Sequence, residues 1–358
     1  MGQSLTTIQF YAHGRRHSTL TGYTKHTKSF PEYNNSPPQS AAYLSPGSPT
    51  LDSVDLTGKT IVITGANSGI GYSLATYCAG KNATVLMFCR SQERGDAAAA
   101  AIAAATSCDP SNVKCVKCDV GLKSSIDAAV SSLPSSLRVD GLVCNAGILL
   151  NDRQLTDDGI ECTAATHLVY GSYYFSKRLL GSAGAGSAGA RLSDSARVVF
   201  LSSGGMYNTK FSWEGCLSID PSRYRCVKGA PRRTCTTRTR TNSTLLCTSA
   251  HSGNLAYAYA KRGQVLLAEE LTKAQGAEGK RIFVSAHPGW VDTPAVDLAY
   301  GSGKRALQPM RNMWQGAEGI SWLLSAADGK LRSGEFYLDR GVQVSEGTAS
   351  LRCSNSCS

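Results

Sequence analysis

The feature that most restricts the fold is a glycine-rich turn at residues 64–71, with the sequence TGANSGIG. It follows the apolar run 60–63, typical of a buried strand, and precedes residues 72–78, typical of a helix. Glycines let the backbone turn tightly and approach a pyrophosphate, while free N–H groups and the helix dipole attract negative charge. Such a turn alone is weak evidence, but here the strand and the helix are both in place. The sequence therefore predicts a nucleotide site, with a ligand-free βα turn as the alternative.

Strands and helices alternate from residue 55 onward. The predicted strands are 60–63, 84–89, 113–118, 139–144, 197–201, 281–285 and 335–338. Continuous apolar strands that alternate with helices indicate a parallel sheet covered on both faces. We expect an α/β fold, a Rossmann-type doubly wound parallel sheet of about seven strands, with ligands at the carboxyl ends of the strands.

The chain divides by composition into one domain with two polar ends. Residues 51–345 form the expected dinucleotide-binding domain, between a polar N-terminal extension and linker at 1–50 and a polar C-terminal tail at 346–358. The stretch 204–252 breaks the alternation and carries an irregular insertion near 225–250, and a loop this long in a compact domain is either functional or disordered. We expect residues 1–50 and 225–250 to be the least ordered parts.

Charge and cysteine content exclude several classes of protein. The net charge is +11, but much of the surplus lies in 15–28 and 223–240, the second with seven Lys or Arg and no acid. A solvated loop explains this better than a nucleic-acid surface, so we expect no nucleic-acid partner. The 13 cysteines are scattered and odd in number, and no secretory signal precedes them. We therefore expect reduced thiols, no metal, and an intracellular, cytoplasmic protein.

The N-terminus carries two weak membrane signals. Residues 1–6, MGQSLT, fit the N-myristoylation pattern at Gly2, and the apolar patch 8–12 precedes basic residues. One acyl chain gives only marginal membrane binding, so a second contact would be needed. No apolar run is long enough to span a membrane. Peripheral membrane contact through the N-terminus stays open, as does a homo-oligomer.

Three side chains beyond the glycine-rich turn have chemistry that suits a redox site. Arg90 ends the second strand with no Asp or Glu there, which favours a ribose 2′-phosphate and hence NADP(H) over NAD(H), the alternative being a surface arginine. Tyr257 and Lys261 are four residues apart on a predicted helix and share a face. Tyrosine is a poor base near neutral pH, and a nearby cation favours its phenolate form.

The spacing T-G-x-x-x-G-I-G resembles that of the short-chain dehydrogenase/reductase superfamily. That resemblance requires an Asp after the third strand, Asn-Ala-Gly after the fourth, a Ser after the fifth and Tyr-x-x-x-Lys on the next helix. Asp119, residues 145–147, Ser203 and the Tyr257–Lys261 pair meet these requirements in order. The match covers residues 55 to 340. Residues 287–294, HPGWVDTP, resemble the family's loop that contacts the nicotinamide carboxamide.

The resemblance implies a role for each matched residue. Ser203 polarises a substrate carbonyl, Tyr257 transfers the proton, and Lys261 tunes Tyr257 and holds the ribose. The family's usual relay Asn is replaced by His167, which either relays protons or is a packed histidine. The expected catalytic residues are Ser203, Tyr257, Lys261 and His167. The expected cofactor-binding residues are Gly65, Asn67, Ser68, Gly69, Ile70, Gly71, Arg90, Asp119, Val120, Asn145, Ala146, Gly147, Tyr257, Lys261, Pro288, Gly289, Val291 and Thr293.

A finer resemblance is to the branch of dehydrogenase/reductase SDR family member twelve-like proteins. It rests on the loop 287–294, on 202–207 (SSGGMY), on 333–340 (SGEFYLDR) and on 10–14 (FYAHG). In that branch the segment between the Ser and the Tyr is shorter, so the insertion near 225–250 is a departure. No motif reveals the substrate. An apolar lining of a lipid-like or retinoid-like site is suggested by Trp213, Trp290, Leu298 and Trp314.

The sequence thus predicts an NADP(H)-dependent oxidoreductase that moves hydride between nicotinamide and a carbonyl or alcohol substrate. The alternative is a non-catalytic NADP(H)-binding sensor or scaffold, which the missing relay Asn and the insertion keep open. A nucleic-acid binder that uses 223–240 is a further alternative, which salt-sensitive retention would support.

Overall fold

The computed structural model describes residues 11–28, 49–181, 191–213, 216, 252–294, 296–297, 301–327 and 329–345. Several expectations fall outside these residues. They concern acylation of Gly2, most of the patch 8–12, the basic stretch 223–240, the insertion near 225–250 and the tail 346–358.

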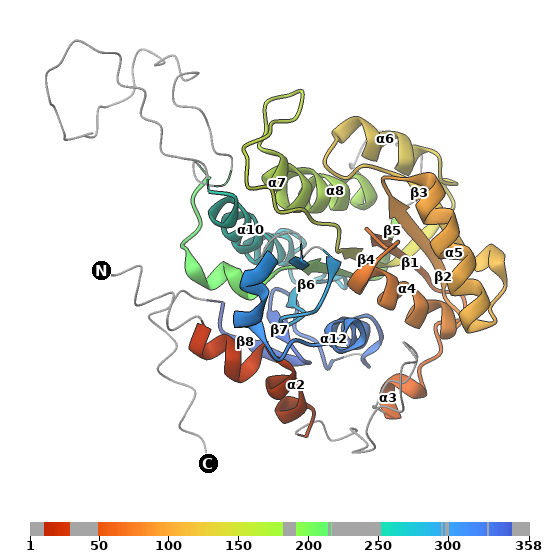
Figure 1. Ribbon diagram of the computed structural model, residues 1–358. Coiled ribbons are helices and arrows are strands. Elements are labelled where there is room, and N and C mark those ends of the chain that lie inside the picture. The colour runs from red at the N-terminus through yellow and green to blue at the C-terminus, as the bar shows by residue number, and fades with distance from the viewer. Residues whose placement is uncertain are drawn as a thin grey trace, which may run out of the picture.

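One eight-stranded sheet organises the described residues, with strand order β3-β2-β1-β4-β5-β6-β7-β8 (Figure 1). Its strands are β1 Thr60–Thr64, β2 Thr84–Cys89, β3 Val113–Lys117, β4 Arg138–Cys144, β5 Arg191–Leu201, β6 Ile282–His287, β7 Phe336–Leu338 and β8 Gly341–Gln343. All neighbouring strands pair in parallel except β7 and β8. The predicted doubly wound α/β sheet is therefore confirmed, with an antiparallel edge strand added.

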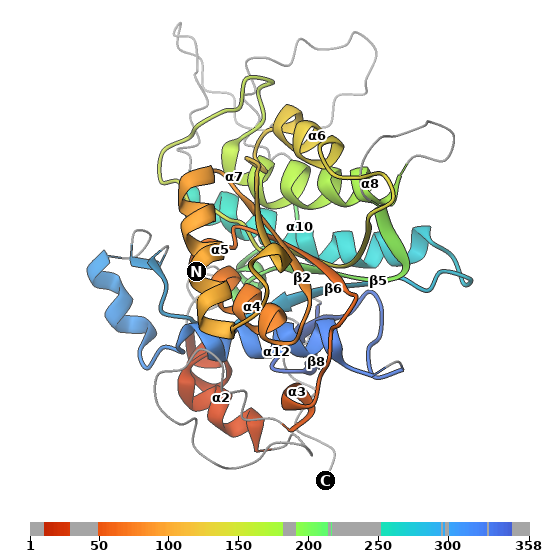
Figure 2. The same ribbon diagram turned by 90° about the vertical axis from the view of Figure 1, so that its right-hand side faces the viewer.

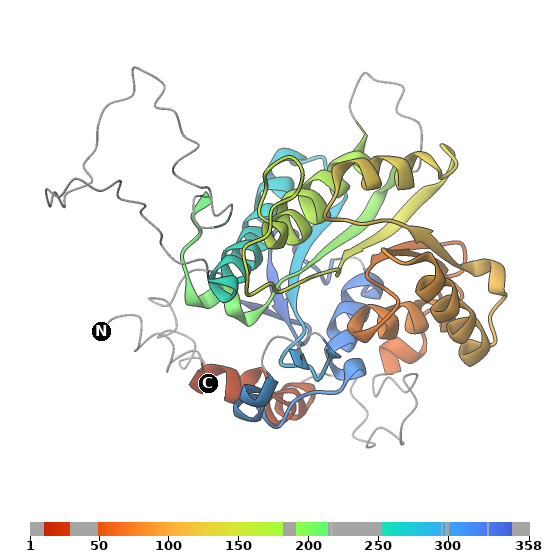
Figure 3. The same ribbon diagram turned by 45° about the horizontal axis from the view of Figure 1, so that its top comes forward.

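Helices cover both faces of the sheet (Figure 3). One face packs against α4 Gly69–Gly80, α5 Gln92–Thr106 and α12 Met313–Ser325, and the other against α6 Lys123–Ser131, α8 Phe175–Leu180 and α10 Gly253–Ala274. Strand β1 shows why: Ile61 and Ile63 enter the first core cluster, whereas Val62 between them enters the second. Because side chains alternate along a strand, a fully apolar strand supplies two cores.

The helix that follows β4 is not a regular α-helix. It consists of α7 Cys162–Ala164, the π-helix η2 Ala165–Tyr174 and α8. A Cβ atom at Gly171 would lie 1.9 Å from the carbonyl oxygen of Thr166, so the widened turn depends on this glycine. The alternation of strands and helices predicts a helix here, but apolar periodicity does not distinguish an α-helix from a π-helix. Wide turns of this kind occur frequently at functional sites.

The N-terminal extension differs from our expectation over residues 11–28. Residues 11–17 are helical and α2 spans Leu20–Thr27, with Tyr23 and Thr27 buried. Figures 1 and 2 show α2 beside α12 and the β7–β8 edge of the sheet. We expected residues 1–50 to be among the least ordered parts of the chain. The structure nevertheless gives 11–28 helices and contacts with residues far along the chain, such as Asp339, and composition gives no signal of such contacts.

The described residues carry neither a metal cluster nor a membrane-spanning helix. No group of three or more His, Cys, Asp or Glu side chains within the described ranges could hold a metal ion. The cysteines described there are free thiols. None of the helices in this part of the chain is both long and apolar enough to cross a bilayer.

Candidate active site

The glycine-rich turn joins β1 to the N-terminus of α4. Gly65 and Gly69 have φ angles of +65° and +59°, which other residues rarely adopt. At Gly71 a Cβ atom would lie 2.6 Å from the carbonyl oxygen of Gly65. The turn is therefore built from glycine for steric reasons, and it precedes the first N–H groups of α4, which have no partner within an α-helix. This geometry fits a pyrophosphate, and Asn67 and Ile70 complete the turn.

Asn145 ties the end of β4 to this turn. Its Nδ2 donates to the carbonyl oxygen of Thr64 at 2.8 Å, and its own N–H donates to Thr64 Oγ1 at 2.9 Å. Ala146 also donates to Thr64 Oγ1, at 2.9 Å. The exposed Gly147 follows, and a Cβ atom there would lie 2.3 Å from His167 Cε1. The small residues at 145–147 therefore allow close approach on both sides of the backbone.

Arg90, Asp119 and Val120 follow β2 and β3, at the adenosine end of the predicted site. Arg90 is exposed at the end of β2. Asp119 Oδ1 accepts the N–H of Gly121 at 2.9 Å, which is a turn-forming contact, and Val120 is buried. Asp119 therefore stabilises the turn that follows β3.

Ser203 and Tyr257 border the same space beyond the end of β5. A Cβ atom at Gly205 would lie 3.6 Å from Ser203 Oγ and 3.7 Å from Tyr257 Cε1. Ser203 begins a short 3-10 turn, Gly204–Asn208, and Tyr257 is on the first turns of α10. Both side chains are partly buried. The two hydroxyl-bearing residues thus come from separate elements and converge, as the predicted roles require.

Lys261 lies one turn after Tyr257, with its Nζ 5.4 Å from the centre of the Tyr257 ring. The Nζ donates to the carbonyl oxygen of Leu201 and, at 3.1 Å, to Gln264 Oε1. Burial lowers the pKa of Lys261 to about 7, and Cys144 acts in the opposite direction. A buried ammonium with two carbonyl acceptors is held in a fixed position beside the tyrosine ring.

A chain of hydrogen bonds continues from Lys261 into the π-helix. Gln264 Nε2 donates to Ser172 Oγ at 2.9 Å, and Ser172 Oγ donates to the carbonyl oxygen of His167. Gln264 and Ser172 are both buried. The sequence reasoning missed these two residues, although Gln264 could have been found, since it is polar and falls on the Lys261 face of α10.

His167 is placed beside Tyr257 but is buried. The two ring centres are 5.2 Å apart in an edge-on arrangement, and His167 Nε2 lies 2.7 Å from the carbonyl oxygen of Ile148. Burial, with a contribution from the Lys261 charge, lowers the pKa of His167 well below its usual range. The imidazole ring is therefore neutral near pH 7. The chain of hydrogen bonds from Lys261 ends at the backbone carbonyl oxygen of His167 and does not include this ring.

The loop after β6 approaches the glycine-rich turn. A Cβ atom at Gly69 would lie 3.8 Å from Thr293 Cγ2, so the two segments border one another. Gly289 has a φ of +82°, and a Cβ atom there would lie 2.2 Å from Arg311 Nε. Pro288 is half-buried and Val291 is buried. All the predicted cofactor residues within the described ranges thus lie along the carboxyl-end edge of β1 to β6.

The residues expected to line an apolar substrate site do not lie together in the structure. Trp314 packs on Tyr77 at a ring-centre distance of 5.6 Å, in the core between α4 and α12. Trp290 packs against Tyr11, and Trp213 is 54% exposed. Leu298 lies outside the described residues. Trp314 was therefore a wrong choice, because an amphipathic helix places its tryptophan in the core as readily as in a binding site.

Comparison with known proteins agrees with this architecture. A family model for short chain dehydrogenases matches residues 59–181. Dehydrogenase/reductase SDR family member 12 from Bos taurus is 29% identical over 333 residues, covering 92% of this chain and 87% of that protein. Retinol dehydrogenase 12 from Bos taurus is 30% identical over 294 residues, covering 80% and 79%. A short-chain dehydrogenase/reductase structure from Brucella melitensis aligns with a TM-score of 0.56 at 19% identity, over 79% and 95%, which shows the shared fold.

The sheet topology and these similarities together define an oxidoreductase that uses a nicotinamide cofactor. The chain belongs to the short-chain dehydrogenase/reductase family. Within that family it is similar to the member 12 proteins over nearly its whole length, which confirms the finer resemblance predicted from the motifs.

Proposed function

We propose that this protein is an NADP(H)-dependent oxidoreductase that transfers hydride between nicotinamide and a carbonyl or alcohol carbon. The observation that carries the proposal is the convergence of Ser203, Tyr257 and Lys261 at the strand edge that also holds the glycine-rich turn. When bound, the nicotinamide would supply or accept the hydride. The steric fit of the glycines at 65, 69 and 71 supports binding of its pyrophosphate.

In this proposal the protein's side chains manage the proton. Ser203 Oγ donates to the substrate oxygen and stabilises the charge that develops there. Tyr257 delivers a proton to that oxygen, or removes one in the reverse direction. Lys261 supplies positive charge beside the tyrosine and holds the ribose hydroxyls. His167 contributes through its carbonyl oxygen, since its ring is neutral and packed.

Arg90 supports the preference for NADP(H). It is exposed at the end of β2, where a guanidinium can pair with a 2′-phosphate. We expect NADPH to bind roughly 10- to 100-fold more tightly than NADH, in line with a hydrogen bond to a charged group. Arg90→Asp should erase or reverse this preference in a fluorescence titration. Arg138→Asp, at an exposed position at the amino end of β4, is the matched control. Equal affinities in the unmodified protein would contradict the assignment.

The pKa of Lys261 predicts a pH dependence of cofactor binding. Lys261 binds ribose as an ammonium, and burial lowers its pKa to about 7, so NADPH affinity should fall as pH rises above about 7. Gln264→Leu removes an acceptor of that ammonium and should move the fall to lower pH. Gln264→Glu adds a negative charge and should move it to higher pH. The cofactor phosphate also titrates, so the same titration with Lys261→Met defines the background. Identical midpoints in both Gln264 variants would contradict this role.

Substrate class is supported only by similarity. One relative that is 30% identical is named a retinol dehydrogenase, so retinoid-like and other lipid-like carbonyls are the first compounds to assay. The deciding experiment is oxidation of NADPH by the purified protein with a broad panel of aldehydes and ketones. Turnover with any of them supports an enzyme. Tight NADPH binding without turnover would favour the alternative, a non-catalytic NADP(H)-binding sensor or scaffold.

Membrane contact through Gly2 and residues 8–12 and assembly into a homo-oligomer are separate proposals. Gly2→Ala should reduce the membrane-bound fraction of the protein if acylation anchors it. An unchanged distribution would remove the lipid assignment.

A further inference from the structure

We infer that residues 11–28, which we call the N-terminal clamp, are a positioning element of the cofactor site. The clamp fixes the loop 287–293, which the proposed function assigns to the nicotinamide end of the cofactor. The inference rests on that proposed function. On this inference Ser18 and Gly14 help to position the loop 287–293, although the first motif of the predicted cofactor site begins about 45 residues later in the chain.

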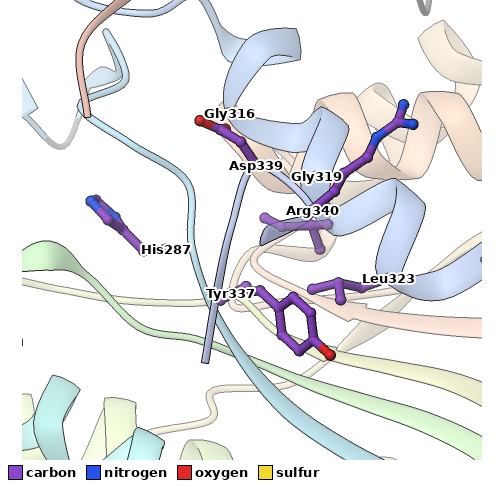
Figure 4. Close-up of a pocket in the computed structure, with 9 residues that line it drawn as sticks. His287, Gly316, Gly319, Leu323, Tyr337, Asp339 and Arg340 are labelled. Atoms are coloured by element: carbon purple, nitrogen blue, oxygen red, sulfur yellow. The ribbon is translucent and has the colours of Figure 1, made fainter. Parts of the chain in front are cut away.

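The buried Arg311 joins the clamp to the loop. Its side chain is fully buried and donates to the carbonyl oxygens of His17 at 2.8 Å, Ser18 at 2.9 Å and Pro288 at 3.3 Å. Its charge is balanced by Asp339, which lies at the end of β7 beside Gly316 and Gly319 of α12 (Figure 4). One guanidinium therefore holds the clamp, the loop and the sheet edge together.

His287 connects the clamp to both halves of the site. Its Nδ1 accepts the N–H of Gly289 at 3.2 Å, so its Nε2 carries the proton. That Nε2 donates to Ser18 Oγ at 3.1 Å. Burial lowers the pKa of His287 to about 3, which keeps the ring neutral in this tautomer. The same ring would lie 2.9 Å from a Cβ atom at Gly204, next to Ser203.

The clamp also packs directly on the loop. The backbone N–H of Trp290 donates to the carbonyl oxygen of Ser18 at 2.7 Å. A Cβ atom at Gly14 would lie 2.1 Å from the Trp290 ring, so the indole is seated against the clamp backbone. Three residues on, Thr293 borders the glycine-rich turn. A displacement of the clamp would therefore be transmitted along a short loop to the predicted nicotinamide position.

The test compares two ligands in the full-length protein. NADPH reaches the loop, whereas adenosine 2′,5′-bisphosphate occupies only the adenosine end near Arg90. Ser18→Ala should weaken NADPH binding by about 3- to 10-fold, the range for one lost neutral hydrogen bond, and leave adenosine 2′,5′-bisphosphate affinity unchanged. Gly14→Ala, which presses on Trp290, should give the same pattern. Thr24→Ala, at an exposed position on α2, is the matched control.

Each outcome decides between the explanations. Equal weakening of both ligands would mean general loosening of the fold and would overturn the inference. Unchanged NADPH affinity in Ser18→Ala and Gly14→Ala would overturn it as well. Failure of the unmodified protein to bind either ligand would instead count against the proposed function.

Discussion

Tyr257→Phe is expected to reduce turnover by about 10² to 10⁴, the usual contribution of general acid–base catalysis, with NADPH affinity almost unchanged. The substitution removes the transferable proton and leaves the ring that packs beside His167 and Lys261. Steady-state kinetics with the best substrate of the carbonyl panel, together with NADPH titration, measure the two effects separately.

Two other tyrosines serve as controls for this experiment. Tyr259 lies two residues along α10 and packs in a separate apolar cluster, and Tyr173 is 41% exposed with its hydroxyl bonded to Lys177. Phenylalanine at either position should cost far less activity. Lys261→Ala should lose both turnover and NADPH affinity. Near-normal turnover by Tyr257→Phe would show that the catalytic tyrosine is misassigned.

Asp339→Asn is expected to destabilise the protein by about 3 to 5 kcal/mol, the cost of leaving a buried charge without its partner. Arg311 is fully buried and pairs with Asp339 through both guanidinium ends. Asparagine keeps the side-chain shape and tolerates the φ of +50° at this position, so the effect reports the lost charge together with the replacement of one acceptor oxygen by an amide donor. Urea unfolding measures the change in free energy. Asp194→Asn, in an ion pair whose carboxylate is 98% exposed, should change stability by no more than about 1 kcal/mol.

The same pair predicts a direction for acid denaturation. Burial acts to raise the pKa of Asp339, but Arg311 and His26 outweigh it and hold that pKa below its usual range. The carboxylate therefore stabilises the fold above its unfolded pKa and loses this contribution as pH falls through the folded value. Asp339→Asn should accordingly flatten the loss of stability at low pH. If Asp339→Asn matches the unmodified protein at neutral pH, the pair contributes little.

The sequence predicted the sheet well because its signals are local. Most strands from β1 to β6 contain a short apolar run and are followed by a motif, and parallel strands bring those motifs to one edge. The positions of Ser203, Tyr257 and Lys261 therefore followed from order along the chain. The chain's membership of the family also followed from those motifs. Which residues bind cofactor or catalyse stays a prediction.

The features that the sequence did not reveal depend on contacts between residues far apart in the chain, or on a backbone form that has no apolar pattern of its own. Arg311 is one arginine among many in the sequence, and only the fold brings it to Ser18 and Asp339. His287 stood in a recognised motif, but its link to Ser18 spans 269 residues. The π-helix was hidden because its apolar pattern matches that of an ordinary helix, and Gly171 there looked like any other glycine.

The N-terminal clamp has a consequence for how this chain is made. His26 and Asp339 are bonded across 313 residues, so the clamp leaves the ribosome long before its docking surface exists. At about 5 to 20 residues per second, that interval is roughly 15 to 60 s. For most of that interval the carbonyl groups of His17 and Ser18 lack Arg311, the side chain that donates to them in the folded protein. Docking of the clamp must therefore follow release of β7 and β8, and a nascent chain paused before β7 would hold strands β1 to β6 without the contact between the clamp and Asp339.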